Sequence, residues 1–269
     1  MSPNVQRSMG HGAAWMVLFK LTERSLGAIS TLILVRILAP SDFGIVAMAV
    51  SFSAMAEMLG AFGFDVALIQ NRAADESHYH TAWTLNVLLG LGISLFIAIA
   101  AKPVAMFYHQ PGLIWVVLAT AIGPLVGGFE NIGVVAFRKD LQFRREAAYQ
   151  ISRKIVGFAV VVPLALWTHS YWALVAGSLT SRLTGTVMSY WVHPFRPKFF
   201  LAASQAIFRF SKWLLLNNLL NFLRVRASDF VIGRFLGPAT LGLYNVSAEF
   251  ASLPTTDLGA PINRALLPG

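Results

Sequence analysis

Long apolar stretches, most of about 17–25 residues, recur along the whole sequence and are separated by polar connections. At a rise of about 1.5 Å per residue, such a stretch forms a helix that crosses the hydrocarbon core of a bilayer. The pattern predicts helices at residues 14–38, 43–67, 81–101, 113–136, 152–168, 171–191 and 213–236, and another that starts near residue 241. We therefore expect an all-α polytopic membrane protein.

The first predicted helix differs from a plain membrane anchor because it carries charged residues. Lys20, Glu23, Arg24, Gly27 and Thr31 follow spacings of three and four residues, which places them on one face of a helix. Each charge inside a membrane costs at least about 2.5–3.5 kcal/mol, so such charges are usually kept for a cavity or an ion pair. The face is expected to line a polar cavity or to pair with a neighbouring helix.

The end of this helix recurs later in the sequence. The pattern Arg-x-Leu-x-Pro-x3-Gly occupies residues 36–44 and again residues 234–242, 198 positions further on. Six helices per copy would orient both copies alike, which predicts a parallel repeat about an axis along the membrane normal. We assign residues 1–200 to an N-terminal six-helix lobe and residues 201–269 to the start of a second lobe, so we expect the sequence to be incomplete at its C-terminus. Two chance matches to a short pattern are the alternative.

Composition supports the membrane assignment. Hydrophobic residues make up 56% of the sequence and charged residues 12%, compared with about 25% charged residues in a typical soluble domain. The net charge of +9 is therefore interpreted as loop charge of a membrane protein, and no nucleic-acid partner is predicted. The absence of cysteine excludes disulfides, thiolate metal ligands and thiol catalysis.

Basic residues outside the predicted helices alternate between connections. The amino-terminal tail and the loops near residues 71–80, 137–154 and 192–212 hold nearly all of them, whereas the other connections are short. Because lysine and arginine favour the cytoplasmic side of a membrane, we expect the N-terminus to lie in the cytoplasm.

Three segments occur in an order that resembles the Wzx-type polysaccharide flippases: RSLGAISTLILVRILAPSDFGIVAMAV at 24–50, GFDVALIQ at 63–70 and FRKDLQF at 137–143. These flippases belong to the multidrug/oligosaccharidyl-lipid/polysaccharide exporter superfamily. The resemblance implies two MATE-like six-helix lobes around a central cavity in the bacterial inner membrane. It also implies that the cargo is an undecaprenyl-diphosphate-linked oligosaccharide for lipopolysaccharide or exopolysaccharide synthesis. Its partners would be the bilayer, this lipid-linked oligosaccharide, a polysaccharide polymerase and glycosyltransferases.

Positive groups inside the helices are candidates for binding the diphosphate of such a cargo. Arg24 and Glu57 are expected at similar depths in the membrane, roughly 14 and 15 Å from the inner ends of the first two helices. Lys20 and Asp65 are both expected near those inner ends. In one interpretation Lys20 and Arg24 bind the diphosphate and Glu57 is a protonatable counter-ion. In the other, these charges form ion pairs that fix the packing of the helices.

Two further polar stripes complete the predicted site. The sixth helix carries Arg182 near the membrane centre, and a cavity role is expected for its polar face, with inter-helix packing as the alternative; the other members of this face are Ser178, Ser181, Gly185 and Ser189. The seventh helix carries asparagines and charges, which suit sugar hydroxyls as well as phosphate. The candidates for substrate binding are Lys20, Arg24, Arg182, Asn218, Asn221 and Arg226. The candidates for a coupling or counter-ion role are Glu23, Glu57, Asp65 and Asp229.

Motifs of common enzyme chemistry are missing from the sequence. It contains neither G-x-x-x-x-G-K-[ST] nor H-E-x-x-H, which indicates no ATP hydrolysis by this protein and no zinc-protease site. We predict a transporter that is not an enzyme, with no catalytic residue, cofactor or metal. One alternative is a drug or cation antiporter of the same superfamily, which the intramembrane arginines disfavour. Another is a membrane-embedded polysaccharide polymerase or transferase, which the short outer loops disfavour.

Overall fold

The computed structural model describes residues 21–60, 62–70, 75–140, 142–201 and 226–251, and no strand occurs in these ranges. The helices are residues 21–35, α2 (Pro40–Leu59), α3 (Phe64–Gln70), α4 (Glu76–Tyr108), α5 (Leu113–Gly128), η1 (Ile132–Val135), α6 (Ala136–Lys139), α7 (Phe143–Thr168), α8 (Trp172–Val192) and residues 226–251. Within the described residues, α2, α4 and α7 are long and apolar enough to cross a membrane, and α5 with η1 and α6 forms a fourth span if the bent pair is counted as one. The prediction of an all-α membrane protein is confirmed.

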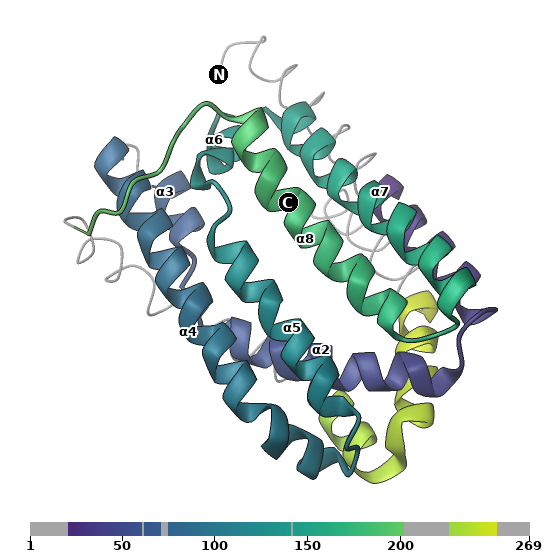
Figure 1. Ribbon diagram of the computed structural model, residues 1–269. Coiled ribbons are helices and arrows are strands. Elements are labelled where there is room, and N and C mark those ends of the chain that lie inside the picture. The colour runs from purple at the N-terminus through teal and green to yellow at the C-terminus, as the bar shows by residue number, and fades with distance from the viewer. Residues whose placement is uncertain (1–20, 61, 71–74, 141, 202–225, 252–269) are drawn as a thin grey trace, which may run out of the picture.

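The helices pack as neighbouring antiparallel pairs. α4 lies beside α5 and α7 beside α8, and α5 also contacts α8 (Figure 1). The largest core lies where α2 crosses α4 and α5, and Met48, Ile97 and Leu113 are fully buried there. Outward-facing side chains are apolar as well, since Leu95 and Ile99 of α4 are 62% and 70% exposed. Such exposed apolar rows suit lipid as the surrounding medium.

The connections between helices gather at two opposite ends of the molecule (Figure 1). The hairpin end, as we call it, carries residues 36–39, 109–112 and 169–171, and also Gly237, where a positive φ of 81° bends the segment 226–251. The basic end carries α3, α6 and the extended residues 193–201. Its charged side chains include Arg138, Lys139, Arg144, Arg145, Arg196 and Lys198. The predicted alternation of short loops and basic loops therefore corresponds to two ends of one helical body.

Two predicted helix boundaries are wrong, one at a glycine that interrupts a helix and one at a proline that does not end a helix. The predicted helix 43–67 is interrupted between α2 and α3, where Gly63 has a positive φ of 65°, a conformation that favours glycine. The predicted helix 81–101 is longer, because α4 continues through Pro103 and ends at His109, which adopts the left-handed conformation. Apolar membrane helices tolerate internal proline, so Pro103 does not end α4.

Asp75 caps the start of α4 and extends it toward the preceding loop. Its carboxylate accepts hydrogen bonds from the Ser77 hydroxyl at 2.7 Å and from the backbone N–H of His78 at 3.2 Å. Side-chain hydrogen bonds from Ser77 and His78 hold the pKa of Asp75 well below its usual range. The cap therefore stays negatively charged at the helix N-terminus, where a negative charge is favourable.

The predicted helix 113–136 is broken, and the break does not lie at its internal proline. Pro124 is inside α5, whereas a bend of 72° separates α5 from residues 132–139. Asn131 at the break is fully buried. Its side chain accepts from the N–H of Gly133 at 2.9 Å and donates to the carbonyl oxygen of Phe195 at 2.7 Å.

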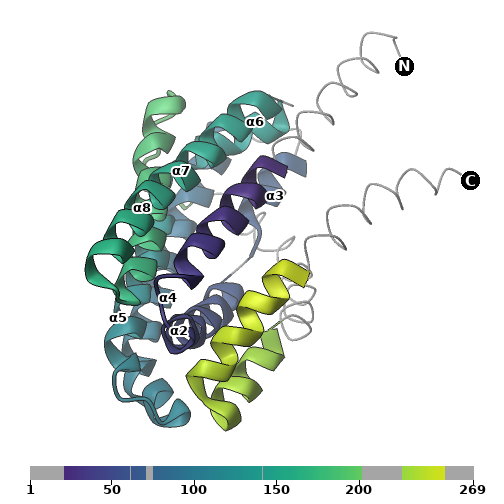
Figure 2. The same ribbon diagram turned by 90° about the vertical axis from the view of Figure 1, so that its right-hand side faces the viewer.

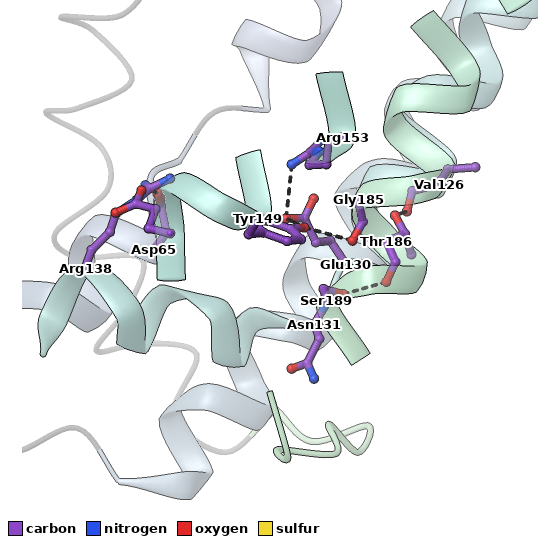
Figure 3. A network of polar contacts seen from close by, with 11 residues as sticks. Asp65, Val126, Glu130, Asn131, Arg138, Tyr149, Arg153, Gly185, Thr186 and Ser189 are labelled. Atoms are coloured by element: carbon purple, nitrogen blue, oxygen red, sulfur yellow. Dashed lines mark hydrogen bonds and ion pairs between the residues drawn. The ribbon is translucent and has the colours of Figure 1, made fainter. Parts of the chain in front are cut away.

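Hydroxyl groups of α8 satisfy more of the backbone at this break (Figure 3). Ser189 accepts from the N–H of Asn131 at 2.9 Å, and Thr186 donates to the carbonyl oxygen of Val126 at 3.0 Å. Non-helical backbone within a membrane protein is stable only where it finds such internal partners. Ser189, expected to face a cavity, therefore supports the broken span.

The basic segment 137–154 is not one loop, because α7 already begins at Phe143. Its first turns are held by a partly buried contact with Glu130. The hydroxyl of Tyr149 lies 2.6 Å from Glu130 Oε1 and 2.8 Å from the carbonyl oxygen of Gly185, and Arg153 Nη1 lies 3.4 Å from Glu130 Oε1 (Figure 3). The predicted start of this helix, residue 152, is thus too late by more than two turns.

Candidate functional site

A cavity of about 730 Å³ lies between the helix of residues 21–35, α2, α7, α8 and the segment 226–251. Polar residues on its walls are Ser30, Thr31, Lys154, Ser178, Ser181, Arg226, Asp229, Tyr244, Asn245 and Glu249. A smaller cavity of about 250 Å³ adjoins it and shares Gly27, Lys154 and Glu249 with it. The larger volume falls in the range of about 300–1,000 Å³ that is usual for ligand sites.

The polar face of the first helix lies on the walls of these cavities. Glu23, Arg24 and Gly27 line the smaller cavity, and Gly27 and Thr31 line the larger one. This agrees with the helical spacing of these residues in the sequence. Lys20, the other charged member of the predicted face, lies outside the described residues.

Lys154 of α7 lines both cavities, and sequence reasoning missed it. Its Nζ lies 2.9 Å from Glu23 Oε1 of the first helix, and its side chain is 44% exposed. The sequence pattern groups Lys154 with the basic segment 137–154, because it lies in the first turn of the predicted helix 152–168. Its spacing to Gly157, Phe158 and Val161, which also line the larger cavity, is that of one helical face and could have identified it.

Arg226 and Asp229 form the second charged group of the larger cavity. Arg226 Nη1 lies 3.0 Å from Asp229 Oδ2, and the Asp229 side chain is 3% exposed whereas that of Arg226 is 37% exposed. The hydroxyl of Ser51 on α2 also donates to Asp229, at 2.6 Å. Asp229 is therefore held by two donors, while its arginine partner reaches the cavity.

Glu57 does not have the partner that helix depth suggested. Arg182 of α8 donates from Nη2 to both carboxylate oxygens of Glu57, at 2.8 and 3.0 Å. A Cβ at Gly123 of α5 would lie 3.2 Å from Arg182 Nε, so the pair sits between α2, α5 and α8. Arg24 instead lies at the smaller cavity. The expected pairing of Arg24 with Glu57 is wrong, because helix packing presents α8 to Glu57 and turns Arg24 toward a cavity.

Asp65 also has a different partner from the one expected. It lies in the first turn of α3, and its Oδ2 is 3.5 Å from Arg138 Nη1 of α6 (Figure 3). Arg138 in turn contacts Glu146 at the start of α7. This series of charges joins three elements at the basic end, away from both cavities. A counter-ion role for Asp65 in the cavity therefore has no support from its position.

Two other predicted residues, Asn218 and Asn221, lie outside the described residues. The structure thus places Glu23, Arg24, Arg226 and Asp229 at the cavities, and Glu57, Arg182 and Asp65 in contacts between helices. Tyr244, Asn245 and Glu249 are cavity residues that were not among the predicted site residues. In the part of the sequence that the structure describes, no three histidine, cysteine or acidic residues gather as metal ligands would.

Among the described residues, the two cavities together combine three cations and three carboxylates with hydroxyl and apolar groups. Lys154, Arg24 and Arg226 carry the positive charge, and Glu23, Asp229 and Glu249 the negative charge. Such a lining can bind an anionic group through the cations and hydroxyl-bearing groups through serine, threonine and asparagine side chains. The cavities therefore present charged groups among largely apolar walls inside an all-α multi-pass membrane protein.

Comparison with known proteins identifies the family. Residues 33–269 match the family described as "Polysaccharide biosynthesis protein", and the chain belongs to this family. No solved structure matches the chain significantly.

Three relatives from different bacteria carry names that refer to the biosynthesis of succinoglycan, lipopolysaccharide and teichuronic acid. The chain is 26% identical to the succinoglycan biosynthesis transport protein ExoT of Rhizobium meliloti (strain 1021), over 100% of the chain and 55% of that protein. It is 24% identical to the lipopolysaccharide biosynthesis protein WzxC of Escherichia coli (strain K12), over 96% of the chain and 53% of that protein. It is 22% identical to the teichuronic acid biosynthesis protein TuaB of Bacillus subtilis (strain 168), over 99% and 56%. The chain spans about half the length of these relatives.

Proposed function

We propose that the protein moves lipid-linked oligosaccharide units, carried on undecaprenyl diphosphate, across the bacterial inner membrane for surface polysaccharide synthesis. The family match over residues 33–269 carries this proposal, and a relative named as a transport protein supports it. The cavity between the helices supplies a place for the polar part of the cargo. Glycosyltransferases would supply the cargo and a polymerase would consume it.

The charges of the cavity suit the diphosphate of this cargo. A diphosphate loses its hydration when it enters a low-dielectric layer, and cations must offset that cost. Lys154, Arg24 and Arg226 are the described cavity residues that can do so. Lys154 and Arg226 already contact carboxylates, so the cargo would compete with Glu23 and Asp229 for them. Ser178 and Ser181 could hydrogen-bond sugar hydroxyls.

The repeat suggests how the protein is organised around the cavity. We assign residues 1–200 to a first six-span lobe and residues 201–269 to the beginning of a second, parallel lobe. The cavity is bounded by helices of both parts, namely residues 21–35, α2, α7 and α8 on one side and 226–251 on the other. A cavity between two such lobes is what a two-lobed transporter requires.

Deletion of the chromosomal gene tests the proposed function. We expect surface polysaccharide to be lost and lipid-linked single repeat units to accumulate on the cytoplasmic leaflet, measured by lipid extraction and mass spectrometry. Repeat units that reach the periplasm without being polymerised would indicate a polymerase instead. Normal polysaccharide with increased sensitivity to cationic drugs would indicate a drug antiporter.

The distribution of basic residues also predicts the orientation in the membrane. The basic end should face the cytoplasm and the hairpin end the periplasm. Because the sequence has no cysteine, single cysteines can be labelled selectively. In intact cells, a membrane-impermeant maleimide should label His169→Cys at one end of α7, and should label Arg144→Cys at its other end only after the cells are opened. The reverse result would contradict the orientation.

A further inference from the structure

The two copies of the repeated pattern lie directly against each other. A Cβ built at Gly44 would be 1.7 Å from the carbonyl oxygen of Pro238, and one built at Gly242 would be 1.9 Å from the carbonyl oxygen of Pro40. Both distances are far shorter than any contact a real Cβ makes, so only glycine fits at either position without moving the neighbouring backbone.

These contacts are reciprocal. Pro40 and Pro238 occupy equivalent places in the two copies, and so do Gly44 and Gly242, each pair being 198 positions apart. The glycine of each copy therefore receives the proline carbonyl of the other. A two-fold relation between the copies produces this exchange, because it makes the same surface patch contact itself.

Two hydrogen bonds obey the same relation. Thr31 donates to Glu249 Oε2 at 3.1 Å, and Ser51 donates to Asp229 Oδ2 at 2.6 Å. The separation of 198 positions relates Thr31 to Asp229 and Ser51 to Glu249. The two bonds are therefore equivalent to each other: in each, the position of Thr31 in one copy contacts the position of Ser51 in the other copy. The hydroxyl comes from the first copy and the carboxylate from the second in both cases, so the contact is kept although the residue types differ.

The contacts occupy one end and the middle of the molecule. The glycine–proline contacts lie at the hairpin end, and the helical segment 226–251 is seen beside α2 in Figure 2. Thr31 and Asp229 precede their prolines by nine residues, which is about 14 Å along a helix. Arg234, also part of the pattern, fixes this end to α4 because its Nη1 lies 2.7 Å from His109 Nδ1.

The cavities extend in the other direction. Along the first helix, the larger cavity is lined as far as Leu26 and the smaller one continues to Arg24 and Glu23. These residues lie toward the basic end, away from Pro40. Toward the hairpin end the larger cavity is lined as far as Leu34 and Phe43, next to Gly44, so the contact between the two copies bounds the cavity on that side.

We propose that the two Pro-x3-Gly turns form a two-fold seal that closes the cavity at the hairpin end and must part before cargo can leave on that side. The Thr31–Glu249 and Ser51–Asp229 hydrogen bonds hold the two halves of this seal together. The proposal rests on the proposed transport function. The glycines let the backbones approach closely enough to exclude water and headgroups, and the contact has no covalent link that would prevent its opening.

The seal can be tested by access to a cysteine in the cavity. Ser178→Cys lies on the cavity wall, and a membrane-impermeant maleimide applied from the hairpin side should label it slowly. Adding Gly44→Ala or Gly242→Ala should raise the labelling rate about tenfold or more. The added methyl group has no room in the closed state, and the resulting clash should shift the equilibrium from closed to open by at least that factor. Gly92→Ala is the matched control, because a Cβ there meets nothing within 4 Å.

Unchanged labelling in both Gly44→Ala and Gly242→Ala would overturn the proposal. A second measurement covers the case in which these variants fail to fold. In the otherwise cysteine-free protein, Ser51→Cys with Asp229→Cys should be joined by a short, reducible thiol cross-linker, detected as a linked peptide by mass spectrometry. In the linked protein, a small probe that does not react with thiols should not enter the cavity from the hairpin end. After reduction of the cross-linker, the probe should enter again. Absence of the link in folded protein would also overturn it.

This test is independent of the identity of the cargo. If the gene deletion leaves lipid-linked oligosaccharides unchanged, the proposed function fails while labelling and cross-linking still report whether the seal exists. If labelling and cross-linking fail while the deletion blocks export, the seal is wrong and the function stands.

Discussion

Replacing Lys154 with glutamine is expected to reduce export of the lipid-linked oligosaccharide at least tenfold while the protein stays in the membrane. Lys154 lines both cavities, and glutamine preserves much of its length but not its charge. A charge-assisted hydrogen bond contributes about 1.5–3 kcal/mol, and about 1.4 kcal/mol corresponds to a factor of ten. Export is measured as surface polysaccharide per unit of membrane-inserted protein, with the substitution in the chromosomal gene.

Two further variants separate binding from packing. Arg144→Gln removes a positive charge from an exposed position near the start of the same helix and should leave export unchanged. Glu23→Gln removes the ion-pair partner of Lys154 but keeps the cation. If Lys154 serves only to neutralise Glu23, the double variant Lys154→Gln with Glu23→Gln should recover export. A role in binding predicts that the double variant stays inactive.

Removing one member of the Glu57–Arg182 pair should have the second large effect, and it should be on stability. Each single variant, Glu57→Gln or Arg182→Gln, leaves an unpaired charge between α2, α5 and α8. A fully buried pair that loses one partner costs about 3–5 kcal/mol. The Glu57 and Arg182 side chains are 32% and 39% exposed. We therefore expect each single variant to lower the free energy of unfolding by about 1–3 kcal/mol, less than for a fully buried pair. The result should be a lower melting temperature in detergent and less protein in the membrane.

The double variant Glu57→Gln with Arg182→Gln distinguishes the two roles that the sequence allowed for Arg182. It removes both charges, so it should recover most of the stability lost in the single variants. Recovery of export together with stability would assign Arg182 to helix packing, as its contacts indicate. Recovered stability without recovered export would return Arg182 to the binding site. A double variant as unstable as the singles would contradict the ion-pair argument itself.

Local patterns predicted those features of the protein that depend on neighbouring residues. Apolar runs indicated the membrane helices, and the spacing of Glu23, Arg24, Gly27 and Thr31 indicated one polar face, because helical periodicity places these residues together whatever surrounds them. Helix boundaries were less predictable where the backbone at the boundary is hydrogen-bonded by residues that are distant in the sequence. The break at Asn131, for example, depends on hydroxyl groups of α8, which nothing in the adjacent sequence indicates.

The ion pairs also depend on tertiary packing and could not be predicted from local sequence. Helix depth alone pairs Glu57 with Arg24, since depth is set by position along a single helix. The structure pairs Glu57 with Arg182 across 125 positions, because a partner is chosen by how helices rotate and pack around one another. Lys154 likewise looks like a loop residue in the sequence, whereas the contact between Tyr149 and Glu130 fixes an earlier start of α7 and places Lys154 well inside it.

The sequence by itself determined the class of protein, the family resemblance and the existence of two copies of one short pattern. Composition, hydropathy and pattern recurrence are properties of the sequence that need no coordinates. Only the tertiary structure decided that Gly44 meets Pro238 and Gly242 meets Pro40, and which cations reach the cavity. Those facts depend on close packing between segments almost 200 positions apart, where sub-ångström space decides whether a side chain fits.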